Sequence, residues 1–136
     1  MADAYLDACC FIYLTEGAVA WRAAVESRLK GLPGTSGLVT SRLSRLECRS
    51  KPLRDRNAAL LAQYDAALAT TRIVDVSAAI IERATEIRAR YGFRSPDAIH
   101  LATAIDEGAD VFVTGDAALG RCAEITVDVL SPVATP

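Results

Sequence analysis

Short apolar runs alternate along this chain with longer segments in which apolar residues recur every three or four positions. The strongest run covers residues 110–114, where Val111, Phe112 and Val113 follow one another and Gly115 ends the run. Runs of this length, bounded by polar residues or glycine, are typical of buried strands. We therefore predict short strands at 5–6, 37–40, 72–74, 110–114 and 125–130.

The segments between the runs have the spacing of amphipathic helices. Ile80, Ala84 and Ile87 form an apolar stripe, with Ser77 predicted as the N-cap and Gly92 as the residue that ends the helix. Trp21, Val25 and Leu29 indicate another helix, which stops before the breaker sequence 31–34. Further helices are predicted over 8–14, 41–51, 54–69 and 96–107.

Two helix boundaries follow from proline. Ser95-Pro96-Asp97 predicts a helix start, with serine as N-cap and proline at the first helical position. Pro52 is predicted to end the helix that begins at residue 41, whose Leu43 and Leu46 are expected to face the core.

Strands that alternate with helices predict an α/β fold, a three-layer α/β/α domain with a central, mostly parallel sheet. We expect one domain over 1–136, with 131–136 as a flexible tail. With 51% hydrophobic residues the chain is too apolar to be disordered. It shows neither a basic leader nor an apolar run of membrane-spanning length, so we expect a cytoplasmic protein without a membrane partner.

Four acidic residues lie at the ends of these elements. Asp7 and Asp116 follow predicted strands, Asp97 lies in the first turn of a helix, and Glu47 follows the second strand within a helix. In parallel sheets ligands bind beyond the carboxyl ends of the strands. If the four converge, they form an oxygen-only site for a hard cation such as Mg²⁺ or Mn²⁺. The alternative is that each acid only caps or stabilises a helix.

The net charge of −2 argues against nucleic-acid binding through bulk charge. Basic residues are nevertheless concentrated locally, and most are arginine, which suits contact with phosphate. The candidates for RNA contact are Arg42, Arg45, Arg49 and Arg94, although they are equally compatible with solvated helix faces.

The remaining candidate chemistry is sparse. The four cysteines form no C-x-x-C pair and are interpreted as small buried apolar residues. His100, the only histidine, lies three residues after Asp97; a role as base or ligand is conceivable, but we favour packing or hydrogen bonding.

Four segments in order resemble the acidic motifs of PIN-domain ribonucleases, and the length and order resemble the VapC-type toxin branch of type II toxin–antitoxin systems. The segments are Tyr5-Leu6-Asp7, 41–47 ending in Glu47, 95–104 beginning Ser95-Pro96-Asp97, and Val113-Thr114-Gly115-Asp116. The resemblance covers roughly residues 4–130.

The resemblance implies a Mg²⁺- or Mn²⁺-dependent endoribonuclease that acts on RNA such as tRNA or rRNA. By position, Asp7, Glu47, Asp97 and Asp116 carry over as the catalytic, metal-binding acids, and Thr114 as a residue that orients Asp116. It also implies a homodimer that is neutralised by a cognate antitoxin protein.

The chain departs from the family pattern at two places. Ala8-Cys9-Cys10 stands where many relatives have a hydroxyl residue, and Ala118 stands where many have a further acid, which favours one firmly held metal. The alternatives are a PIN-like module that binds RNA or protein without cleavage, and, less favoured, a receiver-type signalling domain. The latter needs a lysine near the last strand, and neither Lys30 nor Lys51 is so placed.

Overall fold

Five parallel strands form one sheet at the centre of the computed structural model, which describes residues 3–32 and 37–133. The strand order is β3-β2-β1-β4-β5, and every neighbouring pair is parallel. The five predicted strands are therefore confirmed, with bounds β1 (Asp3–Leu6), β2 (Gly37–Ser41), β3 (Arg72–Val74), β4 (Val111–Thr114) and β5 (Thr126–Val129).

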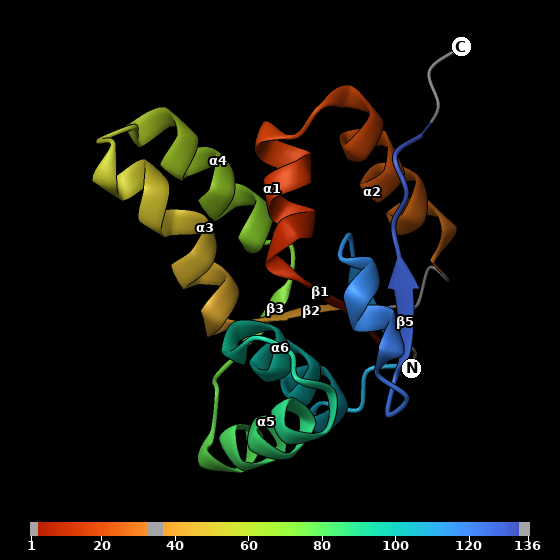
Figure 1. The fold of residues 1–136 in the computed structure, drawn as a ribbon. Helices are drawn as coiled ribbons and strands as arrows, with labels where there is room; N and C mark the ends of the chain where they lie inside the picture. The colour runs from red at the N-terminus through yellow and green to blue at the C-terminus, as the bar shows by residue number, and fades with distance from the viewer. Residues whose placement is uncertain (1–2, 33–36, 134–136) are drawn as a thin grey trace.

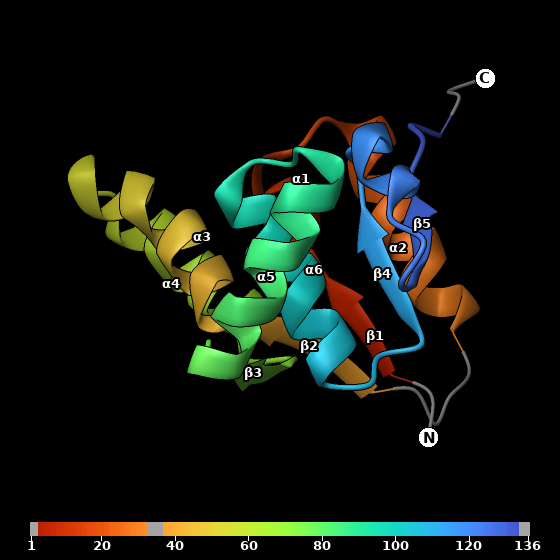
Figure 2. The same ribbon diagram turned by 60° about the horizontal axis from the view of Figure 1, so that its bottom comes forward.

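Helices cover both faces of this sheet, as the two ribbon views show (Figures 1 and 2). One face carries α5 and α6, and the other carries α1, α2 and α4, with α3 packed beside α1 and α4. The predicted three-layer α/β/α fold is confirmed. The helices are α1 (Ala8–Glu16), α2 (Val19–Gly31), α3 (Arg42–Arg54), α4 (Ala58–Leu68), α5 (Ala78–Tyr91) and α6 (Ser95–Asp106), and a short 3-10 helix, η1 (Ala117–Arg121), follows β4.

Alternation along β1 divides the core into two layers. Tyr5 points to the layer formed with α5 and α6, whereas Ala4 and Leu6 point to the layer formed with α1, α2 and α4. Residues 4–6 of β1 are apolar and buried, as expected of a strand whose successive side chains enter cores on opposite faces of the sheet. Its carboxyl end is thereby fixed at the centre of the sheet.

The predicted orientation of α3 is wrong. Leu46 is 63% exposed and Leu43 is half-buried, whereas the buried side of the helix is formed by Ser44, Cys48 and Pro52. Pro52 also lies inside the helix instead of ending it. Its missing N–H removes one helical hydrogen bond, and the helix continues only as far as Arg54.

Other boundaries agree more closely with the sequence. Ser77 caps α5 by accepting a hydrogen bond from the amide of Ile80, and Gly92 ends the helix in the left-handed conformation. At α6 the helix begins one residue earlier than predicted, with Arg94 at the N-cap and Ser95 already helical.

Two predictions fall partly outside the described residues: the breaker sequence at 33–34 and the end of the tail at 134–136. Within the described ranges, no helix has both the length and the apolar character that crossing a membrane requires.

Candidate active site

The four predicted acids line one cavity of about 410 Å³ at the carboxyl edge of the sheet. Asp7 follows β1, Glu47 lies on α3, Asp97 lies in the first turn of α6, and Asp116 follows β4. We call this cavity the acidic pocket. The parallel sheet brings residues that are more than a hundred positions apart in the chain to the same edge.

Asp7 is the buried acid of the pocket. Its Oδ1 accepts a hydrogen bond from the amide of Ala8 (2.7 Å), and its Oδ2 accepts one from Thr114 Oγ1 (2.8 Å). Burial raises the pKa of the Asp7 carboxyl above its ordinary value, although the charge of His100 and the bond from Thr114 oppose this. Asp7 therefore holds a proton more readily than a surface aspartate in the metal-free protein.

Thr114 connects the two acids that follow strands. Its hydroxyl donates to Asp7 and accepts a hydrogen bond from the amide of Asp116 (3.1 Å). One buried hydroxyl thus fixes the side chain of Asp7 and the backbone of Asp116. The sequence resemblance implied a contact with Asp116 alone.

Cys9, at the position where the sequence resemblance leads us to expect a hydroxyl residue, lies beside the same two strand ends. Its Sγ accepts a hydrogen bond from the amide of Gly115 (3.3 Å) and lies 3.7 Å from Asp7 Oδ2. Unlike the other three cysteines, it is only half-buried and lines the acidic pocket. The interpretation as a buried apolar residue fits Cys10, Cys48 and Cys122 but not Cys9.

Asp97 and Asp116 are held by partners close in sequence. Arg94 Nε donates to Asp97 Oδ2 (3.1 Å) from an arginine side chain that is 79% exposed. Asp116 is the N-cap of η1 and accepts from the amide of Ala118 (3.0 Å). The helix-capping alternative is therefore correct for Asp116 and Asp7, but it does not exclude the pocket, because both caps face it.

Glu47 is held by His100, a contact that the sequence spacing did not single out. His100 Nε2 lies 2.5 Å from Glu47 Oε1 and 3.6 Å from Asp7 Oδ1, and its Nδ1 lies 2.7 Å from the hydroxyl of Tyr5. Burial lowers the pKa of His100, but the hydrogen bond to Glu47 and the charges of nearby acids outweigh it and raise that pKa. The only signal in the sequence was the position of His100 one helical turn after Asp97.

The donor set of the acidic pocket suits a hard cation. All four acids present carboxylate oxygens, which Mg²⁺ and Mn²⁺ prefer. In the ranges 3–32 and 37–133, however, no three histidine, cysteine, aspartate or glutamate side chains are already arranged around a point where a metal ion would bind. The contacts above explain this, since each acid is turned toward a protein donor.

Of the four arginines predicted to contact RNA, the structure places one at the acidic pocket. Arg94 lines it. Arg42 and Arg49 lie on α3 and form ion pairs elsewhere, Arg42 with Asp75 and Arg49 with Asp65, both at 2.8 Å. Arg45 lies on the same helix and does not line the pocket.

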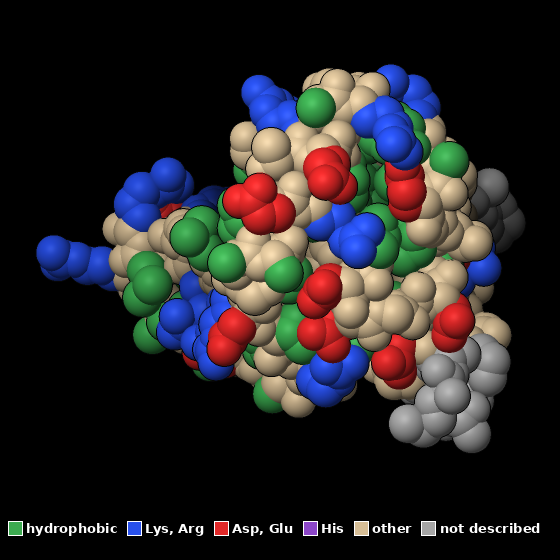
Figure 3. Space-filling model, turned by 90° about the horizontal axis from the view of Figure 1, so that it is seen from below, with side chains coloured by type: hydrophobic (Ala, Val, Ile, Leu, Met, Phe, Trp, Pro, Cys, Tyr) green, Lys and Arg blue, Asp and Glu red, His purple; other side chains and the backbone are tan. Residues whose placement is uncertain are grey.

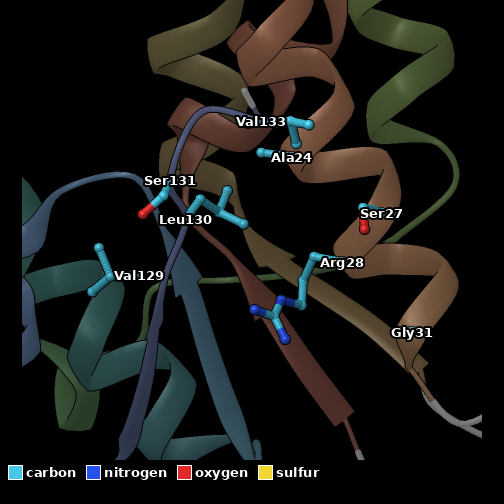
Figure 4. Close-up of a pocket in the computed structure, with 8 residues that line it drawn as sticks. All are labelled: Ala24, Ser27, Arg28, Gly31, Val129, Leu130, Ser131 and Val133. Carbon is cyan, nitrogen blue, oxygen red and sulfur yellow. The ribbon is translucent and has the colours of Figure 1, made fainter. Parts of the chain in front are cut away.

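A slightly larger cavity of about 470 Å³ lies between α2 and the segment after β5 (Figure 4). Arg28 reaches into this space and forms an ion pair with Asp128 (2.6 Å), and the other lining residues are small or apolar. Because its one charged lining residue is already paired, we take the acidic pocket as the candidate site.

Solved structures with the same fold include VapBC and VapC proteins from three bacteria. VapBC2 from Rickettsia felis, bound to a DNA fragment from its promoter, has a TM-score of 0.76 at 16% identity, with 95% of this chain and 99% of that chain covered. VapBC-1 from nontypeable Haemophilus influenzae has a TM-score of 0.75 at 16% identity, with 93% and 97% covered. VapC20 from Mycobacterium tuberculosis, described as a sarcin–ricin loop cleaving toxin, has a TM-score of 0.69 at 17% identity, with 90% and 98% covered.

A comparison with curated protein sequences gives no match. The family model of the PIN domain, by contrast, matches residues 4–125, which include all four acids of the pocket. The chain therefore belongs to the PIN-domain family.

Proposed function

We propose that this protein is a Mg²⁺- or Mn²⁺-dependent endoribonuclease toxin that is neutralised by a cognate antitoxin. The observation that carries the proposal is the acidic pocket itself, in which Asp7, Glu47, Asp97 and Asp116 come from four separate elements to one cavity. Membership of the PIN-domain family and the fold shared with VapC toxins support the same conclusion.

Electrostatics favour a cation in this pocket. Two unit charges about 4 Å apart repel by roughly 4 kcal/mol at an effective dielectric constant of 20. In the metal-free protein Arg94 and His100 offset part of this repulsion at Asp97, Glu47 and Asp7. The Asp116 carboxylate accepts a hydrogen bond from the amide of Ala118 and forms no ion pair within the described residues, so it is the acid most available to a bound ion.

In the proposed mechanism each element has a separate task. When bound, Mg²⁺ or Mn²⁺ would supply positive charge that stabilises the phosphate during attack. Asp7 and Asp116 would hold the ion from the strand ends, with Thr114 fixing their separation. Glu47 and Asp97 would hold it from the helices, and Arg94 would exchange Asp97 for a phosphate of the RNA.

We propose that the protein contacts RNA near the acidic pocket, because the face formed by α5 and α6 shows no broad basic field. On the face formed by α5 and α6, acidic and basic side chains are interspersed with apolar and uncharged ones (Figure 3). Arg42 and Arg49 are already paired with acids on α4 and after β3. Arg94 is therefore the first candidate for phosphate contact, and Arg45 the second.

The similarity to VapBC structures supports a proposal on partners. VapBC structures pair a toxin with an antitoxin, and we propose that this chain has such a partner, which covers the acidic pocket and supplies positive charge to it. We also propose a homodimer, cytoplasmic location, and tRNA or rRNA as the substrate class.

Paired acid substitutions test the proposal. We expect Asp97→Asn and Asp116→Asn to abolish Mg²⁺-dependent RNA cleavage and growth inhibition, with the folded structure retained. Asp75→Asn is the matched control, because its carboxylate is 84% exposed in an ion pair on the surface. Equal cleavage by the parent and both pocket variants would exclude the proposed enzyme.

The second candidate is a PIN-like module that binds RNA or protein without cleavage. One observation favours it: among the described residues the acids are turned toward protein donors and no three of them already surround a metal position. RNA binding by the parent that survives EDTA, together with no cleavage of a broad set of RNAs at millimolar Mn²⁺, would support this alternative.

A further inference from the structure

We infer that Tyr5 and His100 form a buried hydrogen-bond relay that positions the Glu47 carboxylate. Both are then positioning residues of the acidic pocket, although neither lines it. The inference rests on the proposed function, because it assigns Glu47 a geometry that matters for holding a cation.

The relay connects three elements that are far apart in the sequence. Tyr5 lies on β1, His100 on α6 and Glu47 on α3. The hydroxyl of Tyr5 is 2.7 Å from Nδ1 of His100, and Nε2 of the same ring is 2.5 Å from Glu47 Oε1. The imidazole therefore has a partner on both nitrogens, and its two bonds point in opposite directions across the ring.

Packing holds the relay rigid. Tyr5 is fully buried, and its ring stacks on Phe112 of β4 with centroids 5.3 Å apart and planes 8° apart. The ring centroids of His100 and Tyr5 lie 5.8 Å apart in an edge-on arrangement, with 63° between the ring planes, and only 1% of His100 is exposed. The Glu47 side chain, in contrast, is only half-buried on α3. Without a bonding partner it could adopt many rotamers. The rigid ring therefore selects one of them.

The direction of the hydrogen bonds follows from the partners. Glu47 presents a carboxylate, which only accepts, so Nε2 must carry the hydrogen that it donates. A neutral ring then has a bare Nδ1, and the hydroxyl of Tyr5 satisfies it by donating. Nε2 also lies 3.6 Å from Asp7 Oδ1, so the same N–H stands between two acids of the pocket. Tyr5 thus keeps the ring in the tautomer that orients Glu47.

A pair of tyrosine substitutions tests the relay. Tyr5→Phe removes the far hydroxyl and leaves the ring packing and the pocket lining in place. Tyr64→Phe is the matched control, because Tyr64 is equally buried and donates its hydroxyl to Glu16, outside the acidic pocket. Mn²⁺ affinity is measured by calorimetry on each full-length protein, with Mg²⁺-dependent RNA cleavage alongside.

We expect Tyr5→Phe to weaken Mn²⁺ binding by up to about 10-fold, the lower end of the effect of losing a direct partner of a metal-binding side chain, because Tyr5 reaches Glu47 only through His100. Tyr64→Phe should bind Mn²⁺ like the parent. Equal Mn²⁺ affinity and equal cleavage in the parent and Tyr5→Phe would overturn the relay.

A second readout does not depend on metal. His100 is the only histidine of the chain, so nitrogen NMR of the labelled imidazole reports this ring alone. At alkaline pH the parent should carry its ring proton on Nε2 with Nδ1 accepting a hydrogen bond, and Tyr5→Phe should shift the Nδ1 signal to that of a nitrogen without a hydrogen-bond donor. Identical ring signals in the two proteins would overturn the relay. A parent that binds no Mn²⁺ would instead overturn the proposed metal centre, and the NMR comparison alone would then decide whether the relay exists.

Discussion

At the scale of single residues, two serines at helix starts differ in what their hydroxyls do. Ser77 Oγ caps α5, but Ser41, at the N-cap of α3, makes no side-chain cap. Among the described residues, Ser41 Oγ is the buried side-chain oxygen or nitrogen that has no hydrogen-bond partner. Burying a hydroxyl without a partner is costly.

We therefore expect opposite results from the same substitution at the two serines. Ser77→Ala should lower the free energy of unfolding by about 1 kcal/mol, the usual effect of losing a cap. Ser41→Ala should leave it unchanged or raise it, because no hydrogen bond is lost. Urea denaturation of both variants measures this, and a loss at Ser41 as large as that at Ser77 would show that the Ser41 hydroxyl has a partner.

Thiol reactivity is a second property set residue by residue. Burial raises the pKa of the Cys48 thiol to about 12 and also raises that of Cys122, while the hydrogen bond with Cys9, together with burial, raises that of Cys10. Thiolate is the reactive form, so these three should react slowly in the folded protein. Cys9 is half-buried at the acidic pocket and should react first with a chromogenic disulfide. We expect one fast thiol in the parent and none in Cys9→Ser; a fast phase that persists in that variant would assign the reactivity to another cysteine.

At the scale of elements, the sequence predicts strands and helices well but orients α3 poorly. β1 and β4 could be predicted because fully buried parallel strands are continuously apolar. The buried side of α3 instead consists of Ser44, Cys48 and Pro52, none of which is strongly hydrophobic, while Leu46 faces outward. The helix packs close to α1 and α4, so small residues fit its buried side and the apolar pattern misleads.

The turn after β4 supports a prediction on backbone approach. A Cβ on Gly115 would lie 2.5 Å from the hydroxyl of Tyr13, whose ring stacks on Trp21 at 4.6 Å and so has little room to move. Gly115→Ala should therefore destabilise the protein by roughly 1–3 kcal/mol and displace the turn that carries Asp116. Gly120→Ala is the control, because its Cβ would meet Val129 at 3.6 Å, an ordinary contact. Equal urea midpoints for the two variants would show that Tyr13 moves aside freely.

At the scale of the whole molecule, the meeting of the four acids could be predicted from topology, but their present partners could not. Parallel strands place Asp7 and Asp116 at one edge whatever their neighbours are. The bond from His100 to Glu47, however, depends on how α3 and α6 approach each other across the sheet. The sequence analysis favoured packing or hydrogen bonding for His100, but local spacing carries no information on which residues are its partners.

Stability of the entire fold should respond to the proposed ion. A ligand that binds only the native state adds about 2.7 kcal/mol when its concentration is 100 times its Kd. For a chain of 136 residues this corresponds to a rise in Tm of roughly 10 °C. We expect such a rise with saturating Mn²⁺ in the parent and in Asp75→Asn, whose carboxylate pairs with Arg42 on the surface. Asp97→Asn and Asp116→Asn should lose most of it, and EDTA should return the parent to its metal-free Tm.

Because all four acids are fixed by different elements, the ion would connect β1, β4, α3 and α6, so the shift should appear as one cooperative transition. An equal rise in Asp97→Asn and Asp116→Asn would place the ion outside the acidic pocket.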